Sequence, residues 1–253
     1  MDDGNRIIVT MPAYHAEATL EKTYRDIPEE LGVEVLVVDD ASKDNTVGVA
    51  QKLGLKVFVH PANRGYGGNQ KTCYNEALRA QASVIVLLHP DYQYDPRTLT
   101  ALVEPLLNGR ADFTFGSRFA GGSDPRKGGM PQYRYWGNKF TTAIENMALG
   151  THFAELHSGL KAYTREFLES LDYNSYSDDF VFDSQMIIDA VLSHKRIEEV
   201  PIPTRYTIES SSISVSRSLR YIWSTLVQLR RMKKQHKHAA KHADRLAAKG
   251  KTR

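Results

Sequence analysis

The chain has 253 residues, of which 41% are hydrophobic and 25% charged, so it is long enough to bury the core of one full-sized globular domain. No apolar run approaches the roughly 18 residues that a membrane-spanning helix needs, and a single cysteine, Cys73, excludes an internal disulfide. The acidic opening MDDGNRIIVT leads directly into a strand-like run and resembles no secretory signal, so we expect a cytoplasmic protein.

Charge is distributed unevenly along the chain. The formal net charge is +3, yet the residues from Arg217 onward contain twelve Lys and Arg against one acid, which gives +11 there and leaves −8 on the rest. A basic tail on an acidic body favours an anionic partner, either lipid or nucleic acid, or else a solvated helix. We predict a folded domain over residues 1–210 and a helical tail over residues 211–253.

The first half of the chain alternates between two kinds of segment. Apolar, β-branched runs predict strands over residues 6–14, 33–42, 55–61, 83–91 and 111–119. Helical patterns fill the intervals, over residues 16–31, 43–54, 65–81 and 95–109. This alternation is typical of βαβ units, and it predicts an α/β fold with a mostly parallel central sheet and helices on both faces.

The pattern becomes less regular after Ala120. A glycine-rich loop over residues 120–129 leads to an aromatic and basic helix over residues 131–150, and a strand-like run follows at residues 196–206. The segment at 178–195 contains Asp179 and Asp183, which are candidate general bases but fit the capping and surface positions of an amphipathic helix better.

Polar residues follow two of the predicted strands where the strands end. Pro12 and Tyr14 follow the first strand, and Asp39 and Asp40 follow the second. Ligands of open α/β sheets bind at the carboxyl ends of the strands, where a carboxylate can accept hydrogen bonds from ribose or a base and a tyrosine can stack. The alternative is that the carboxylates cap the next helix.

The loop NRGYGGNQ contains a glycine cluster that invites a dinucleotide-binding interpretation. Gly65, Gly67 and Gly68 do not complete the G-x-G-x-x-G motif, because Gln70 occupies its last position. The cluster also follows the third strand instead of the first. We therefore reject a Rossmann-type cofactor site.

The stretch HPDYQYDP ends the buried strand at residues 83–91. If the chain stays extended there, His89, Asp91 and Gln93 share one face, and their imidazole, carboxylate and amide groups can bind Mn²⁺ or Mg²⁺. The alternatives are a structural histidine and an aspartate that closes a turn.

Seven segments together, TMPAYHAEATL, VLVVDDASKDNT, NRGYGGNQ, HPDYQYDP, FGSRFAGG, HSGLKAY and VPIPTRY, resemble a known family in their order. They are similar to the inverting family 2 glycosyltransferases of GT-A fold, in particular to the dolichol-phosphate mannosyltransferase branch of polyprenyl-phosphate glycosyltransferases. The resemblance covers roughly residues 6–210. It implies a GT-A domain that moves a sugar from a nucleotide-sugar donor onto a lipid phosphate, with a divalent cation, Mn²⁺ or Mg²⁺, as cofactor.

The resemblance also implies roles for individual residues. Its nucleotide-binding positions correspond to Pro12, Tyr14, Glu17, Asp39 and Asp40.

The metal-binding and phosphate-binding positions lie further along the chain. The metal motif maps to His89, Asp91 and Gln93. The remaining positions are Arg118, Arg134 and Asn138 for the acceptor phosphate and Arg205 for the donor phosphates. Among all of these, Asp91, Arg118 and Arg134 are the implied catalytic residues.

Three departures from the family pattern stand out. His15 replaces an asparagine, His89 replaces the first aspartate of the metal motif, and IESSSIS at residues 208–214 replaces a Gly-x-Ser-Lys segment. The second leaves the use of a metal open, and the third leaves open how the loop after Arg205 closes over the donor.

The tail supplies a candidate membrane contact. Apolar residues recur there at helical spacing, at Leu219, Ile222, Trp223, Leu226, Leu229 and Met232. Basic residues accompany them, at Arg220, Arg230, Arg231, Lys233 and Lys234. This pattern predicts an interfacial helix that holds the protein peripherally on the cytoplasmic face of a membrane. The alternative is a helix packed on the body and followed by a basic extension.

We expect a polyprenyl-phosphate glycosyltransferase. The alternatives are a family 2 transferase acting on a glycan or other hydroxyl, which needs an activated base, and a non-catalytic nucleotide-sugar-binding protein. A nucleic-acid partner is not expected, because the body lacks a basic surface to bind one.

Overall fold

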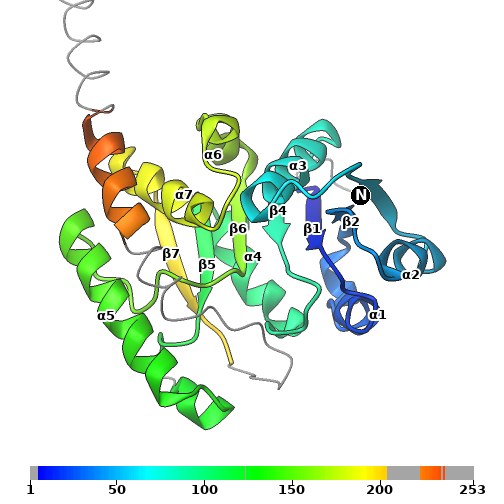
Figure 1. Cartoon of the computed structure of the whole chain (residues 1–253), viewed down its shortest axis with the longest axis horizontal. Coiled ribbons are helices and arrows are strands. Elements are labelled where there is room, and N and C mark those ends of the chain that lie inside the picture. Colours follow the sequence, from blue (N-terminus) through cyan, green and yellow to red (C-terminus); the bar gives the residue numbers. More distant parts are fainter. Residues whose placement is uncertain (1–4, 123, 204–222, 235, 237–253) are drawn as a thin grey trace, which may run out of the picture.

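A mixed, mostly parallel sheet lies at the centre of the protein, in the computed structural model that describes residues 5–122, 124–203, 223–234 and 236 (Figure 1). Its order is β3-β2-β1-β4-β6-β5-β7. The strands are β1 (Ile7–Ala13), β2 (Glu34–Asp39), β3 (Lys56–Val59), β4 (Val84–Leu87), β5 (Phe113–Ser117), β6 (Lys161–Thr164) and β7 (Ile197–Pro201). Strand β6 is antiparallel to both β4 and β5, and the other pairs are parallel. This confirms the predicted fold class.

Helices cover both faces of the sheet, and each face has its own apolar core. The α-helices are α1 (Leu20–Arg25), α2 (Thr46–Lys52), α3 (Tyr66–Arg79), α4 (Leu99–Leu107), α5 (Gln132–Leu149), α6 (Arg165–Glu169) and α7 (Val181–Leu192). The 3₁₀ helices are η1 (Glu29–Leu31), η2 (Pro96–Thr98), η3 (Pro125–Gly128) and η4 (Tyr173–Ser175). Residues of α1, α2 and α4 pack in one core and residues of α3, α6 and α7 in the other.

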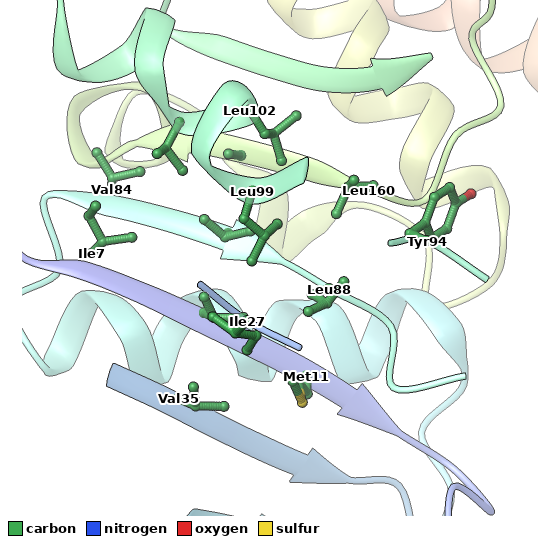
Figure 2. Packing of buried hydrophobic residues seen from close by; sticks show 14 of the residues in the cluster. Ile7, Met11, Ile27, Val35, Val84, Leu88, Tyr94, Leu99, Leu102 and Leu160 are labelled. Atoms are coloured by element: carbon green, nitrogen blue, oxygen red, sulfur yellow. The ribbon is translucent and has the colours of Figure 1, made fainter. Parts of the chain in front are cut away.

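Alternation along the strands divides the side chains between the two cores. Ile7, Val9 and Met11 of β1 belong to the core with α1 and α4, and Figure 2 labels Ile7 and Met11 there. Ile8 belongs to the core with α3. Every residue of β1 is buried, which explains why its sequence reads as a continuous apolar run. Tyr94, which follows β4, closes the end of the first core (Figure 2).

Part of the predicted tail forms a helix, residues 223–234, that packs on the body beside α7 (Figure 1). Leu229 and Met232 are buried against Ile188 of α7. The hydroxyls of Ser184 and Thr225 are 3.1 Å apart. For these residues the structure therefore supports the packed-helix alternative. Apart from His236, the rest of the tail, including Leu219 and Ile222, lies outside the described residues.

No helix of the described part is both long and apolar enough to cross a membrane.

Candidate active site

The candidate site lies where β1, β2 and β4 end side by side. Backbone hydrogen bonds continue beyond the strands, from Asp40 N to Ala13 O at 2.9 Å and from Leu88 N to Thr10 O at 3.0 Å. The sheet therefore brings the ends of the first, second and fourth strands to one edge, as the sequence predicts.

Asp39 presents a buried carboxylate oxygen to this edge. The residue is 1% exposed, and Oδ2 accepts a hydrogen bond from Ser42 N at 2.9 Å. Among the described residues, Oδ1 has no hydrogen-bond partner. An unsatisfied buried acceptor costs about 1–3 kcal/mol, so a ligand donor such as a ribose hydroxyl or a base N–H would stabilise it.

Asp40 uses both carboxylate oxygens within the protein. Oδ1 lies 2.7 Å from His60 Nδ1 and accepts from Arg64 N at 2.8 Å, while Oδ2 accepts from Gly65 N at 3.1 Å. These bonds hold the loop that begins α3. Asp40 thus positions this loop, and its direct contact with a nucleoside stays a prediction.

The glycines of this loop serve close packing. A Cβ on Gly67 would lie 2.4 Å from Ser177 O, so the start of α3 can approach that segment only without a side chain there. Gly65 has a φ of 83°, in the left-handed region that glycine tolerates.

The exit of β1 offers a stacking surface. Tyr14 is 53% exposed and stacks on His15 at a centroid distance of 4.2 Å. His15 N donates to Ser42 Oγ at 2.9 Å, and Glu17 Oε2 accepts from Asn45 N at 2.9 Å, so both residues are tied to the segment between β2 and α2. Pro12 is buried in β1 itself.

The segment from His89 to Gln93 is a turn, which corrects the assumption of an extended chain. Tyr92 has a φ of 58°, and Asp91 Oδ1 accepts from Gln93 N at 3.0 Å, as an aspartate does when it closes a turn. Strict alternation of side chains therefore does not apply here. Asp91 is exposed and lies near enough to His89 for its negative charge to raise the histidine pKa, although burial lowers that pKa more strongly.

A divalent cation fits this donor set only as a partner shared with a substrate. Among the residues that the structure describes, no three His, Cys, Asp or Glu side chains cluster as a complete metal site. Mg²⁺ and similar ions are commonly held by one or two carboxylates plus substrate phosphates and water. An imidazole, an exposed carboxylate and an amide at 89–93 agree with that mode of binding.

A buried polar chain behind His89 was not recognised from the sequence. Lys161 Nζ pairs with Asp183 Oδ1 at 2.7 Å, and the Tyr66 hydroxyl donates to Asp183 Oδ2 at 2.8 Å and lies 3.3 Å from His89 Nε2. The Asp183 side chain is 15% exposed, so its assignment to the protein surface was wrong. Asp179 is exposed, as expected.

The predicted acceptor residues Arg118 and Asn138 converge on a third side chain. Glu155 is completely buried and accepts from Arg118 Nε at 3.0 Å, Arg118 N at 2.9 Å and Asn138 Nδ2 at 2.9 Å. Burial alone would raise the pKa of Glu155, but the charge and hydrogen bonds of Arg118 outweigh it and lower that pKa. Glu155 had no recognisable motif around it.

Arg134 lies half-buried in the first turn of α5, its guanidinium 6.0 Å from the Tyr133 ring centroid. It belongs to the same helix as Asn138. Arg205 lies outside the described residues, so its predicted contact with the donor stays a prediction.

A buried acid and a buried histidine meet between α5 and the segment before β6. Burial raises the pKa of Glu145 to about 8 and lowers the pKa of His157 to about 4. Glu145 Oε2 and His157 Nε2 are 3.3 Å apart. Between these two pKa values both groups are neutral, so the contact is a polar one and not an ion pair.

Replacing Glu145 by glutamine should stabilise the protein, and more at pH 8 than at pH 5. The pKa of Glu145 is raised on folding. The contribution of this group to the free energy of unfolding is therefore fully present below about pH 4.5 and is lost as pH rises toward 8. At pH 7 the loss is on the order of 3 kcal/mol, which a neutral amide avoids. Urea unfolding at several pH values measures it. An equal effect of the substitution at pH 5 and pH 8 would show that Glu145 ionises normally.

Comparisons with known proteins show the family of this chain. The sequence profile of the family described as glycosyl transferase family 2 matches residues 8–172. An uncharacterized protein of Methanocaldococcus jannaschii is 31% identical over 208 residues, covering 82% of this chain and 85% of its own. The UDP-N-acetylglucosamine--dolichyl-phosphate N-acetylglucosaminyltransferase of Methanococcus voltae is 26% identical, covering 79% and 86%. The polyprenol monophosphomannose synthase of Mycolicibacterium smegmatis is 28% identical, covering 78% and 76%.

A solved structure shows the same fold. Glucosyl-3-phosphoglycerate synthase from Mycobacterium tuberculosis, crystallised with Mn²⁺, UDP and phosphoglyceric acid, superposes with a TM-score of 0.68 at 20% identity. The match covers 89% of this chain and 78% of that one.

Proposed function

Because this chain belongs to glycosyl transferase family 2, we propose that it transfers a sugar, with inversion, from a GDP- or UDP-linked donor onto a polyprenyl phosphate at a membrane. Two relatives support this choice of acceptor, one named for transfer to dolichyl phosphate and the other for the synthesis of polyprenol monophosphomannose. The observation that carries the proposal is α5, which places Asn138 beside Arg118 and Glu155 on one side and exposes apolar residues on the other.

The donor would bind along the ends of β1, β2 and β4. Asp39 Oδ1, buried and without a protein donor among the described residues, is suited to a hydrogen bond from the nucleoside, and the exposed ring of Tyr14 can stack on a base. His89, Asp91 and Gln93 would hold a cation, Mn²⁺ or Mg²⁺, which neutralises charge on the departing diphosphate.

The contacts of Asp183 count against one candidate base for a hydroxyl acceptor. A hydroxyl must lose a proton to a positioned base, whereas a lipid phosphate is already ionised near neutral pH. The carboxylate of Asp183 is engaged with both Lys161 and Tyr66, which makes it a poor general base. The guanidinium group of Arg134 suits phosphate oxygens instead, and that of Arg118 would have to serve a phosphate while it is also paired with Glu155.

Helix α5 carries an apolar stripe on the surface of the protein. Its exposed members are Tyr133 at 62%, Trp136 at 61%, Phe140 at 65% and Met147 at 81%. The spacing of three, four and seven residues places them on one face of the helix. Surface helices normally turn such a face toward the core, so this exposed stripe, with Lys139 beside it, is typical of a helix that lies in a membrane interface.

The stripe would bring the reaction centre to the bilayer. Lipid would meet the outer side of α5, and the acceptor phosphate would reach Arg118, Arg134 and Asn138 on the inner side. The basic residues of the tail would add attraction to anionic lipid, of about 1 kcal/mol each near the surface. We therefore place the protein peripherally on the cytoplasmic face of a membrane.

Replacing Trp136 and Phe140 together by glutamate should weaken binding to anionic vesicles by at least about tenfold. Each aromatic ring removed from the interface loses on the order of 1.5–3 kcal/mol. The matched control is Val59→Glu, at an exposed apolar position on β3, which is 55% exposed. Sedimentation with vesicles gives the affinities. Equal binding by the double variant and the control would remove α5 from the membrane contact.

The proposed reaction is tested with a panel of GDP- and UDP-sugars, a short-chain polyprenyl phosphate and Mn²⁺ or Mg²⁺, with products identified by mass. We expect a lipid-linked sugar to form while the nucleotide sugar is consumed. Transfer to water-soluble hydroxyl acceptors in place of the lipid would support the alternative family 2 activity. Donor binding without any transfer would contradict an enzymatic role.

A further inference from the structure

Four side chains, from three elements and the segment after β4, form one polar network that ends at His89. Lys161 opens β6, Asp183 lies in α7, Tyr66 opens α3 and His89 follows β4. The contacts run from Lys161 Nζ to Asp183 Oδ1 at 2.7 Å, from the Tyr66 hydroxyl to Asp183 Oδ2 at 2.8 Å, and from that hydroxyl to His89 Nε2 at 3.3 Å.

The charges of these four side chains determine which of their atoms carry the protons. Lys161 is 1% exposed, and a cation so deeply buried is stabilised by an anionic partner, which makes Asp183 a carboxylate. A carboxylate only accepts hydrogen bonds. The single hydroxyl proton of Tyr66 therefore points to Asp183, and the hydroxyl oxygen is left to accept from His89. The proton of the neutral imidazole must then sit on Nε2.

The surroundings of the imidazole ring hold it in this orientation. The ring stacks on Tyr66 with a centroid distance of 5.5 Å and an interplanar angle of 9°. A Cβ on Gly159 would lie 3.1 Å from His89 Cδ2 and 3.2 Å from Nε2, so this edge of the ring packs closely against the backbone. The nitrogen on the other side of the ring, Nδ1, keeps its lone pair.

We propose that Tyr66 and Asp183 are positioning residues that hold His89 in its Nε2–H tautomer and so present the Nδ1 lone pair to the cation of the donor site. The inference rests on the proposed function for the presence of that cation. Partners of this kind commonly fix the tautomer of a metal-binding histidine through its second ring nitrogen. The histidine that replaces the family's aspartate at position 89 is then held in place by Tyr66 and, through it, by Asp183.

The tautomer is measured directly by ¹⁵N NMR of histidine-labelled full-length protein at about pH 8, where an ordinary histidine is neutral. A His89→Gln variant identifies the signals of His89. We expect Nδ1 to give the signal of an unprotonated nitrogen and Nε2 that of a protonated one. The opposite assignment, with the proton on Nδ1, would overturn the proposal.

Metal binding supplies a second readout. Tyr66→Phe keeps the stacked ring and removes only the hydroxyl, and should weaken binding of Mn²⁺ in the presence of UDP or GDP by about 10-fold to 100-fold. The matched control is Tyr176→Phe, because Tyr176 also donates to an aspartate of α7, Asp189, outside the site. Equal Mn²⁺ affinity in the two variants, with both folded by circular dichroism, would count against a positioning role.

These measurements are independent of sugar transfer. The expected tautomer and Mn²⁺ affinities, together with no transfer to polyprenyl phosphate, would leave the positioning role in place and reject only the acceptor. Transfer to polyprenyl phosphate together with an Nδ1–H tautomer would support the proposed acceptor and reject the positioning role.

Discussion

Replacing Asp91 by asparagine should lower the rate of sugar transfer by about 100-fold to 1000-fold. The substitution removes the one carboxylate among the three predicted cation ligands, and losing charge stabilisation of this kind typically raises the barrier by about 3–4 kcal/mol. The turn should survive, because an asparagine Oδ1 can still accept from Gln93 N, as Asp91 does at 3.0 Å. Initial rates at saturating donor and Mn²⁺ measure the effect.

Asp124→Asn is a matched control for this substitution. Asp124 also closes a short turn by accepting from the backbone N–H two residues on, Arg126 N, at 3.0 Å. Its replacement should change the rate little. If Asp91→Asn retains transfer within about threefold of the control, and excess chelator does not slow the protein, Asp91 does not hold a cation in this reaction.

Of these substitutions, replacing Glu155 by alanine should lower the free energy of unfolding the most. The change leaves the guanidinium of Arg118, whose side chain is only 14% exposed, without its carboxylate, and it also removes the acceptor for Asn138. Breaking a buried ion pair from one side typically lowers the free energy of unfolding by about 3–5 kcal/mol. Urea unfolding followed by circular dichroism measures the change.

Glu198→Ala provides the comparison for Glu155. Glu198 pairs with Arg110 at 3.2 Å, and the two side chains are 41% and 51% exposed. Removing such a surface pair should change the free energy of unfolding by less than about 1 kcal/mol. A loss of similar size for Glu155→Ala would mean that Arg118 finds water or another partner once the carboxylate is gone.

The sequence predicted the sheet well where a strand is buried on both faces. The runs that became β1 and β2 are seven and six residues long and mostly apolar, and the run that became β4 stays apolar and buried through Leu88, so these segments were recognised as buried strands. The antiparallel strand β6 was missed, because its four residues, KAYT, lead directly into α6 and are too short to show a period. Its direction depends on which strands it pairs with, and pairing is a long-range property.

The site was predicted where its residues follow the strands and missed where its contacts are long-range. Tyr14 and Asp39 follow strands whose order places them at one edge, as expected. The structure confirms the alternative of an aspartate that closes a turn at Asp91. The positive φ of Tyr92 was not foreseen, because nothing near it marks a tyrosine for that conformation. Asp183 pairs with Lys161, and Glu155 with Arg118, across large sequence separations that no local pattern reveals.

The antiparallel pairing of β5 with β6 makes residues 118–160 a single excursion from the sheet. Phe115 is paired with Lys161, so the excursion leaves and returns between neighbouring strands, and the sheet can close without it. Helix α5 and Glu155 both lie on this excursion, whereas the predicted donor residues up to Gln93 precede it. The excursion is therefore a segment that can be replaced without removing a strand from the sheet. Moving residues 118–160 into a related protein should transfer the acceptor preference, while the donor preference stays that of the recipient. The replacement must preserve the bonds from Ala154 N and Glu155 N to Glu199 at 2.8 and 2.9 Å.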